Sequence, residues 1–129
     1  MNKFFKKIFG QNEKTSSTSG FDTKEHEIIN NFLNLDANNK VRKIMILGDT
    51  GESKYLPLLK YCISNKFDKD VKFAALKRIH LFEKTEVQNF LIELQKENFT
   101  KNLEPYFSMA LSRVGIITIE EFNNRINGS

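Results

Sequence analysis

The chain has 129 residues, of which 40% are hydrophobic and 28% charged, and its formal net charge is +4. A chain of this length most often forms one domain with one core. Its single cysteine excludes an intramolecular disulfide framework and a cysteine-rich zinc module. No segment approaches the roughly 18–20 consecutive apolar residues of a membrane-spanning helix, so the sequence argues against an integral membrane protein.

The basic excess is concentrated at the N-terminus. Residues 1–20 hold four basic residues and one acidic residue, a net charge of +3, whereas the rest of the chain holds sixteen basic and fifteen acidic residues. On a helical wheel of residues 1–10, apolar and basic side chains occupy opposite arcs. The two sets are Phe4, Phe5, Ile8 and Phe9 against Lys3, Lys6 and Lys7.

This pattern predicts a short basic amphipathic helix over residues 1–10, here called the leader. Such a helix contacts an anionic membrane surface or a partner protein, or packs on its own domain. Residues 11–22 contain five consecutive serines and threonines followed by glycine, which is typical of a flexible linker. The folded domain is therefore expected to span residues 23–129.

Apolar residues recur at helical spacing throughout the domain, and no segment has the pattern of a strand. The first helix is predicted at residues 23–35, and residues 36–39 break the pattern. A short second helix at 41–47 is expected to be stopped by the run Gly48-Asp49-Thr50-Gly51, because glycine commonly terminates a helix. A third helix is predicted at residues 53–64.

Four further helices complete an all-α prediction. Asp70, Thr85 and Thr118 are the expected N-caps of three of them, because short oxygen-bearing side chains accept hydrogen bonds from free backbone N–H groups. The fourth helix of the chain is apolar around most of its circumference, so we expect it to be central and covered on both sides. These four helices are predicted at residues 71–82, 86–97, 103–114 and 119–127.

The helices also repeat. Residues 71–79 align on residues 106–114 at an offset of 35, which matches Arg78 with Arg113, and the preceding pair aligns at an offset of 32. Units of about 30–45 residues that contain two helices are typical of an α-solenoid. The two arginines are expected to bridge stacked units.

Short motifs in each unit carry a family resemblance. They are Val41-Arg42, Leu47-Gly48-Asp49 and Tyr55-Leu56-Pro57-Leu58-Leu59 in the first unit, Asp70-Val71-Lys72 and Ala74-Ala75-Leu76 in the second, and Ala110-Leu111 and Val114-Gly115 in the third. Over residues 40–126 the chain resembles the HEAT-repeat family, particularly its short phycobilisome-lyase-type repeats. The resemblance implies a right-handed α-α superhelix, of the armadillo type, with about three degenerate helix pairs and an N-terminal capping helix at 23–35.

The sequence offers little for catalysis. His26 has charged neighbours typical of a solvated surface, His80 lies near a helix end, and Cys62 belongs to an apolar stripe typical of a buried residue. No nucleophile, zinc-ligand or phosphate-loop spacing is present. We therefore expect no enzymatic activity, no cofactor and no metal ion.

Recognition of another protein is the better prediction. The resemblance implies that the second helix of each pair lines a concave binding face. Tyr61 is the leading candidate there, because exposed tyrosines often anchor interfaces, with packing over a neighbouring helix as its alternative. Mixed charges without a basic stripe weigh against nucleic-acid binding. The outward residues of this face are Lys54, Lys60, Tyr61, Asn89, Ile92, Glu93, Lys96, Asn124 and Arg125.

These features predict a small, cytoplasmic, non-catalytic protein-binding module, either an adaptor or an immunity-like protein that neutralises a toxin. The alternative is a scaffold held at the inner face of the membrane by residues 1–10. A nucleic-acid-binding or lyase-like HEAT protein is the least favoured hypothesis. The Lys-, Asn-, Ile- and Phe-rich composition indicates an AT-rich, bacterial genome.

Overall fold

The computed structural model describes residues 23–127, so the predicted leader and the linker at 11–22 lie outside the described residues. Within that range the chain forms seven α-helices and three 3-10 helices, without a strand, which confirms the all-α prediction there. The elements are α3 (Thr23–Leu33), α4 (Ala37–Thr50), η2 (Ser53–Tyr55), α5 (Leu56–Ser64), α6 (Lys69–Arg78), η3 (Ile79–Leu81), α7 (Lys84–Leu94), η4 (Asn98–Leu103), α8 (Tyr106–Arg113) and α9 (Ile119–Asn127).

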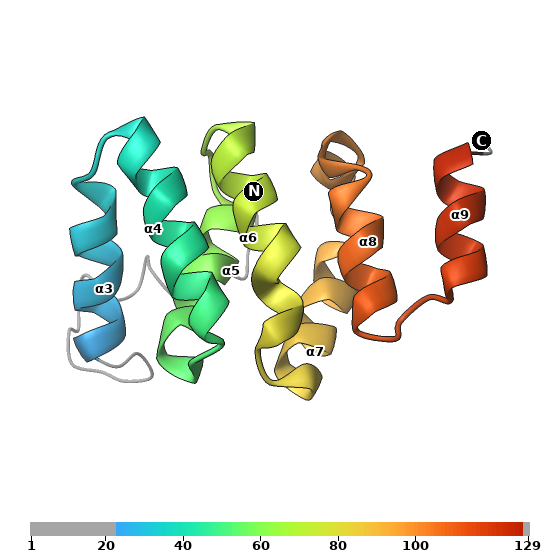
Figure 1. Ribbon diagram of the computed structural model, residues 1–129, viewed down its shortest axis with the longest axis horizontal. Helices are drawn as coiled ribbons and strands as arrows, with labels where there is room; N and C mark the ends of the chain where they lie inside the picture. Colours follow the sequence, from blue (N-terminus) through green and yellow to red (C-terminus); the bar gives the residue numbers. More distant parts are fainter. Residues whose placement is uncertain (1–22, 128–129) are drawn as a thin grey trace.

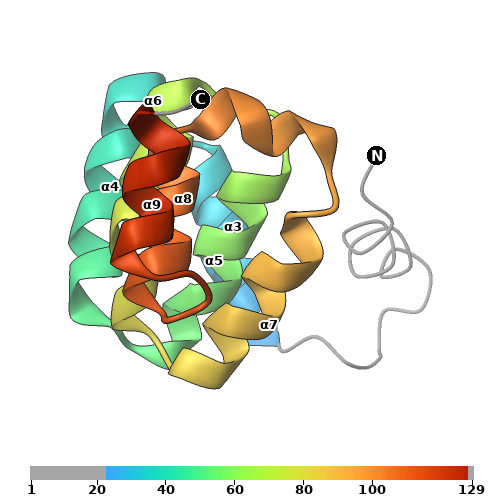
Figure 2. The ribbon, with the colours of Figure 1, turned by 90° about the vertical axis from the view of Figure 1, so that its right-hand side faces the viewer.

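The helices pack in two layers. Helices α4, α6 and α8 lie side by side in the first layer, with α6 contacting both of its neighbours (Figure 1). Helices α3, α5 and α7 lie on the other side of the molecule (Figure 2), and α5 contacts α6 across the layers. Helix α9 packs against α8 at the C-terminal end of the row.

Helix α6 occupies the centre of this arrangement, as its apolar circumference predicts. Its residues Val71, Ala74, Ala75 and Leu76 are buried, and the helix is covered by α4 on one side and α8 on the other. Burial of an aliphatic side chain the size of Leu76 stabilises the fold by about 1.5–3 kcal/mol. The core is therefore built around a first-layer helix that also contacts α5 of the second layer.

Arg78 and Arg113, which match at the offset of 35, each join two helices of the first layer. Arg78 Nε on α6 donates to Asp49 Oδ1 on α4 at 3.0 Å. Arg113 Nη1, at the end of α8, donates to the carbonyl oxygen of Lys77 on α6 at 3.2 Å. Each arginine thus contacts the C-terminal part of the preceding first-layer helix, in agreement with the expected bridging role.

The bounds of α4 differ from the prediction at both ends. Residues 36–39 are not a break, because Asp36 Oδ1 accepts a hydrogen bond from Asn39 N at 2.9 Å and caps a helix that begins at Ala37. At the other end, the first glycine of the predicted stop, Gly48, lies inside the helix, and the last one ends it. The helix continues to Thr50 and ends where Gly51 adopts the left-handed conformation at φ 65°.

Two predicted N-caps are also wrong by two residues. Helix α6 begins at Lys69 after the extended residue Asp68, so Asp70 lies inside its first turn. Helix α7 is capped by Glu83, whose carboxylate accepts from Glu86 N at 2.8 Å, and Thr85 lies within that helix. Several oxygen-bearing side chains compete at each of these starts, and backbone geometry selects among them.

The C-terminal third of the chain contains a further difference. Residues 98–102, which lie between two predicted helices, belong to the 3-10 helix η4, and the following helix begins at Tyr106 rather than at 103. Thr118 is the N-cap that the sequence predicts, since its Oγ1 accepts from Glu121 N at 2.9 Å. The short element η4 is important because it forms one wall of the site described next.

Candidate functional site

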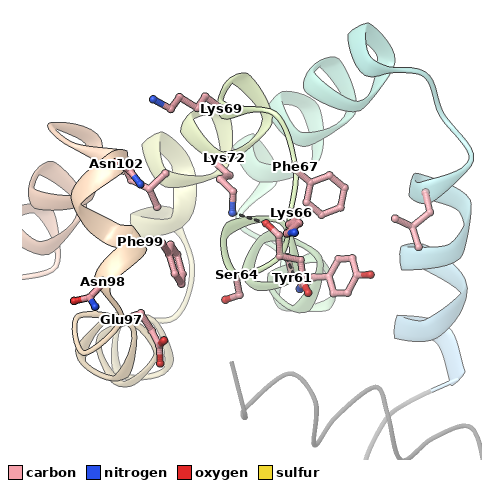
Figure 3. A pocket seen from close by; sticks show the side chains of 13 residues that line it. Tyr61, Ser64, Lys66, Phe67, Lys69, Lys72, Glu97, Asn98, Phe99 and Asn102 are labelled. Carbon is pink, nitrogen blue, oxygen red and sulfur yellow. Dashed lines mark hydrogen bonds between the residues drawn. The ribbon is translucent and has the colours of Figure 1, made fainter. Parts of the chain in front are cut away.

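A groove with a volume of about 1170 Å³ opens between the α5–α6 turn and η4. One wall comes from residues near 61–72 and the other from residues 97–103, which tertiary packing places opposite one another (Figure 3). The residues that line it are Leu33, Tyr61, Ser64, Asn65, Lys66, Phe67, Lys69, Lys72, Glu97, Asn98, Phe99, Asn102 and Leu103.

Aromatic side chains form the first wall. The half-buried ring of Tyr61 meets the ring of Phe67 edge-on, with 5.8 Å between centroids. Phe67 in turn meets the buried ring of Phe32 on α3 edge-on at 5.9 Å. Edge-to-face pairs at these distances are favourable and restrict both rings. Tyr61 is therefore held in the groove by its neighbours.

Lys72 lies between the two walls (Figure 3). Its Nζ donates to the carbonyl oxygen of Ile63 at 2.6 Å and to that of Asn65, both at the C-terminal end of α5. The same ammonium lies 5.4 Å from the centroid of Phe99 on the opposite wall. Carbonyls at a helix C-terminus lack partners within the helix and favour a cation, so Lys72 stabilises the α5–α6 turn.

The protonation of Lys72 reflects two opposing effects. Burial lowers its pKa to about 8, because the charged form loses hydration. The surrounding carbonyl oxygens act in the other direction, since they accept hydrogen bonds from the ammonium. Because its N–H donors are already engaged by these carbonyl oxygens, Lys72 has a structural role.

Two other lysines of the groove are differently placed. Lys66 and Lys69 are exposed, and neither forms an ion pair with any residue that the structure describes. The only acidic side chain among the described lining residues is that of Glu97. The groove is therefore positively charged on balance, with two cations available to a ligand.

Polar groups complete the lining. Ser64 Oγ is buried and has no hydrogen-bond partner among the described residues. The amide side chains of Asn98 and Asn102, both exposed, lie on the opposite wall. Buried polar groups are rarely left unpaired in folded proteins, so an unpaired hydroxyl beside a groove indicates a place for a ligand group.

The predicted concave-face residue Lys60 lies elsewhere, between α5 and α7. Its Nζ is 5.7 Å from the ring centroid of Phe90 on α7. Burial lowers the pKa of Lys60, and the carboxylates of Glu86 and Glu25 oppose this shift. Lys60 therefore links α5 to α7 in the second layer.

Three more predicted residues form local ion pairs at the surface. Lys54 Nζ lies 3.6 Å from Glu52 Oε1, next to η2. Glu93 Oε2 and Lys96 Nζ are 3.3 Å apart near the end of α7. Exposed pairs of this kind contribute about 0–1 kcal/mol each.

The remaining predicted residues are divided between two helices. Asn89 and Ile92 are exposed on α7, whereas Asn124 and Arg125 belong to α9, which packs against α8. Arg125 Nη1 donates to the buried Ser108 Oγ at 3.3 Å. Of the nine predicted residues, Tyr61 alone lines the groove.

Sequence reasoning missed the other aromatic residues of the groove. Phe67 and Phe99 each occur in a mostly polar connection between two predicted helices, at residues 65–69 and 98–102 respectively. A large apolar side chain within a polar break could have been the signal, because a turn exposes such a residue unless it packs locally or binds something.

Groups suited to catalysis are buried or scattered. Cys62 is fully buried, and burial raises the pKa of its thiol. Burial, followed by the charge of Arg113, lowers the pKa of His80. In residues 23–127, no three His, Cys, Asp or Glu side chains are grouped so that they could hold a metal ion. None of the helices in this range combines the length and apolar character needed to cross a membrane.

Comparisons of the chain with protein-family models, with curated proteins and with solved structures find no match.

Proposed function

We propose that this protein is a small HEAT-like α-solenoid that works as a non-catalytic protein-binding module, and that the groove beside Tyr61 is its binding site. The solenoid hypothesis is supported by the row of first-layer helices α4, α6 and α8. It is also supported by Arg78 and Arg113, 35 residues apart, each of which reaches the preceding first-layer helix, through a carboxylate in one case and a backbone carbonyl in the other. Stacked helix pairs of this kind commonly present extended binding surfaces.

The observation that carries the binding proposal is the combination of aromatic walls and unpaired polar groups in one groove. Tyr61 and Phe99 provide apolar surface on opposite walls, and the exposed Lys66 and Lys69 are available for polar contacts. The buried hydroxyl of Ser64 has no partner among the described residues. Binding sites typically join a largely apolar lining with a few placed polar groups. A volume near 1170 Å³ can hold several side chains of a partner.

The second-helix face remains a separate prediction, but its charged residues are engaged by the protein itself. Lys60 lies over Phe90, and Glu93 pairs with Lys96. Arg125 donates to Ser108. A partner that bound there would have to compete with these contacts, whereas the groove lysines are available, so we favour the groove.

Site-specific photo-crosslinking in the native host tests this proposal. A photoreactive phenylalanine derivative would replace Asn102 in the groove, Ile92 on α7, or Lys43 on the outer surface of α4; all three positions are exposed. We expect one protein to be crosslinked from position 102 only. Crosslinking from position 92 instead would favour the second-helix face, and equal crosslinking from all three positions would contradict both surfaces.

A further inference from the structure

We infer that the partner presents an acidic peptide segment to the groove, with carboxylates held by Lys66 and Lys69 and an adjacent apolar side chain packed against Tyr61 and Phe67. This inference rests on the proposed function, because it names the chemistry of the partner at the same site. It follows from charge, from exposed apolar surface and from one buried hydroxyl.

The lysines of the groove differ in whether they are available to a ligand. Lys72 has its donors engaged by the carbonyls of the α5 C-terminus. Lys66 and Lys69 have no anionic partner in residues 23–127, and Glu97 is the single lining carboxylate. Two exposed ammonium groups give selectivity for acidic side chains, even though each exposed ion pair contributes little affinity.

Apolar surface is exposed at the end of the groove next to α3. Leu33 is 39% exposed there, although it is a large hydrophobic residue at the end of a helix. It lies beside the edge-packed rings of Tyr61 and Phe67. An aliphatic or aromatic side chain of the partner would remove this surface from water, which supplies the affinity that the exposed ion pairs do not.

The hydroxyl of Ser64 adds a requirement for a hydrogen-bonding group. Its Oγ is buried at the groove without a partner among the described residues. A peptide backbone supplies N–H donors and carbonyl acceptors along its whole length. These groups can pair with the hydroxyl of Ser64 and with the side-chain amides of Asn98 and Asn102 on the other wall. A peptide therefore matches the lining in charge, in apolar surface and in hydrogen-bonding groups.

Other occupants match less well. A polyanionic nucleic acid gains affinity from many cations, and the groove offers two free ones in a chain whose residues 21–129 carry a net charge of about +1. The leader of this chain carries Lys3, Lys6 and Lys7, which are of the same sign as Lys66 and Lys69. The leader therefore supplies no carboxylate for these two lysines, so an acidic segment of another protein matches the groove better.

The test uses the full chain, isotopically labelled for NMR, and a synthetic heptapeptide, acetyl-Glu-Leu-Glu-Phe-Glu-Leu-Glu-amide. A matched peptide has Gln in place of every Glu. We expect the acidic peptide to shift the amide signals of residues 61–72 and 97–103. We expect the Gln peptide to bind about fivefold to tenfold more weakly, the ratio that two exposed ion pairs of about 0.5–0.7 kcal/mol each provide.

The variant Lys66→Glu/Lys69→Glu should abolish the shifts caused by the acidic peptide. The matched control Arg42→Glu/Lys43→Glu makes the same change of charge on exposed residues of α4 and should bind as the wild type does. If circular dichroism shows that the groove variant is unfolded, Lys66→Gln/Lys69→Gln replaces it. Binding to that variant should fall to the level of the Gln peptide.

Equal binding of the two peptides would overturn the acidic preference and leave the groove as a protein-binding site. Shifts that fall outside the groove, or tighter binding of an octauridylate oligonucleotide or of a peptide of residues 1–10 in the groove, would also overturn the inference. The proposed function itself fails if crosslinking from position 102 captures no protein, or if all three positions crosslink equally, and neither outcome depends on the peptide titration. The two failures are therefore distinguishable.

Discussion

The side chain of Arg78 lies so close to the backbone of Gly48 that a Cβ at position 48 would be 3.0 Å from both the Cβ and the Cδ of Arg78. The glycine, inside helix α4, thus allows α6 to approach. The same arginine reaches Asp49 on α4. A glycine that resembles a helix terminator in the sequence is therefore a packing residue in the fold.

Gly48→Ala should destabilise the protein by about 1–3 kcal/mol, because the Cβ of Arg78 cannot move without its helix. Alanine alone would favour a helix interior by up to about 1 kcal/mol, so the clash must exceed that gain. Urea denaturation measures the difference, and Asn38→Ala, at an exposed position of the same helix, is the control. A urea denaturation midpoint for Gly48→Ala at or above that of the wild type would contradict this prediction, because it would mean that Arg78 can move away from position 48 without cost.

Lys72 should make the free energy of unfolding depend on pH. Burial lowers its pKa from the ordinary 10.5 to about 8, so between these values the unfolded state binds more protons than the folded state. The contribution of Lys72 to the free energy of unfolding therefore rises as pH increases from about 8 to 10.5. Comparing wild type with Lys72→Met by chemical denaturation across this interval isolates the effect, and parallel profiles would refute it.

Ser64→Ala should stabilise the unbound protein by about 1 kcal/mol, since it removes a buried hydroxyl that has no partner within the described residues. The same variant should weaken binding of the acidic heptapeptide, because the ligand loses an acceptor. Thermal denaturation and the NMR titration measure the two effects. A loss of stability would mean that the hydroxyl is already satisfied in the free protein.

Cys62 should be unreactive toward thiol reagents in the native protein. Its side chain is fully buried on α5, and burial raises the pKa of the thiol, so little thiolate is present or accessible. We expect reaction with a disulfide reagent to be at least about a hundredfold slower than in denaturant, as follows from an opening equilibrium of a few kcal/mol. Rapid native reaction would contradict the packing of α5 against α6.

The membrane hypothesis for the leader predicts weak, salt-sensitive flotation of the full chain with anionic vesicles. Its lysines contribute about 1 kcal/mol each at such a surface. Removal of residues 1–20 should abolish flotation, and neutral vesicles are the control. Flotation that is unchanged by the deletion would eliminate residues 1–10 as an anchor.

Local patterns predicted the helices well and their ends less well. Apolar periodicity located all seven α-helices in the described range, and the all-round apolar segment identified α6 as central. The N-caps were less predictable, because Asp68 and Asp70 both suit the start of α6 and only the backbone distinguishes them. The matched positions of Arg78 and Arg113 predicted that these residues join neighbouring units, but the sequence did not identify their acceptors, Asp49 and the carbonyl oxygen of Lys77.

The sequence by itself determined the helical periodicity, the central position of α6 and the concentration of basic charge before residue 21, since each depends on neighbours along the chain. Only the tertiary structure decided the groove, because its walls come from segments about thirty residues apart. Packing brought Phe99 across from Tyr61, engaged Lys72 with the end of α5 and left Lys66 and Lys69 available. Those contacts make Lys72 structural and leave Lys66 and Lys69 able to bind a partner. Residue type alone does not distinguish the three lysines.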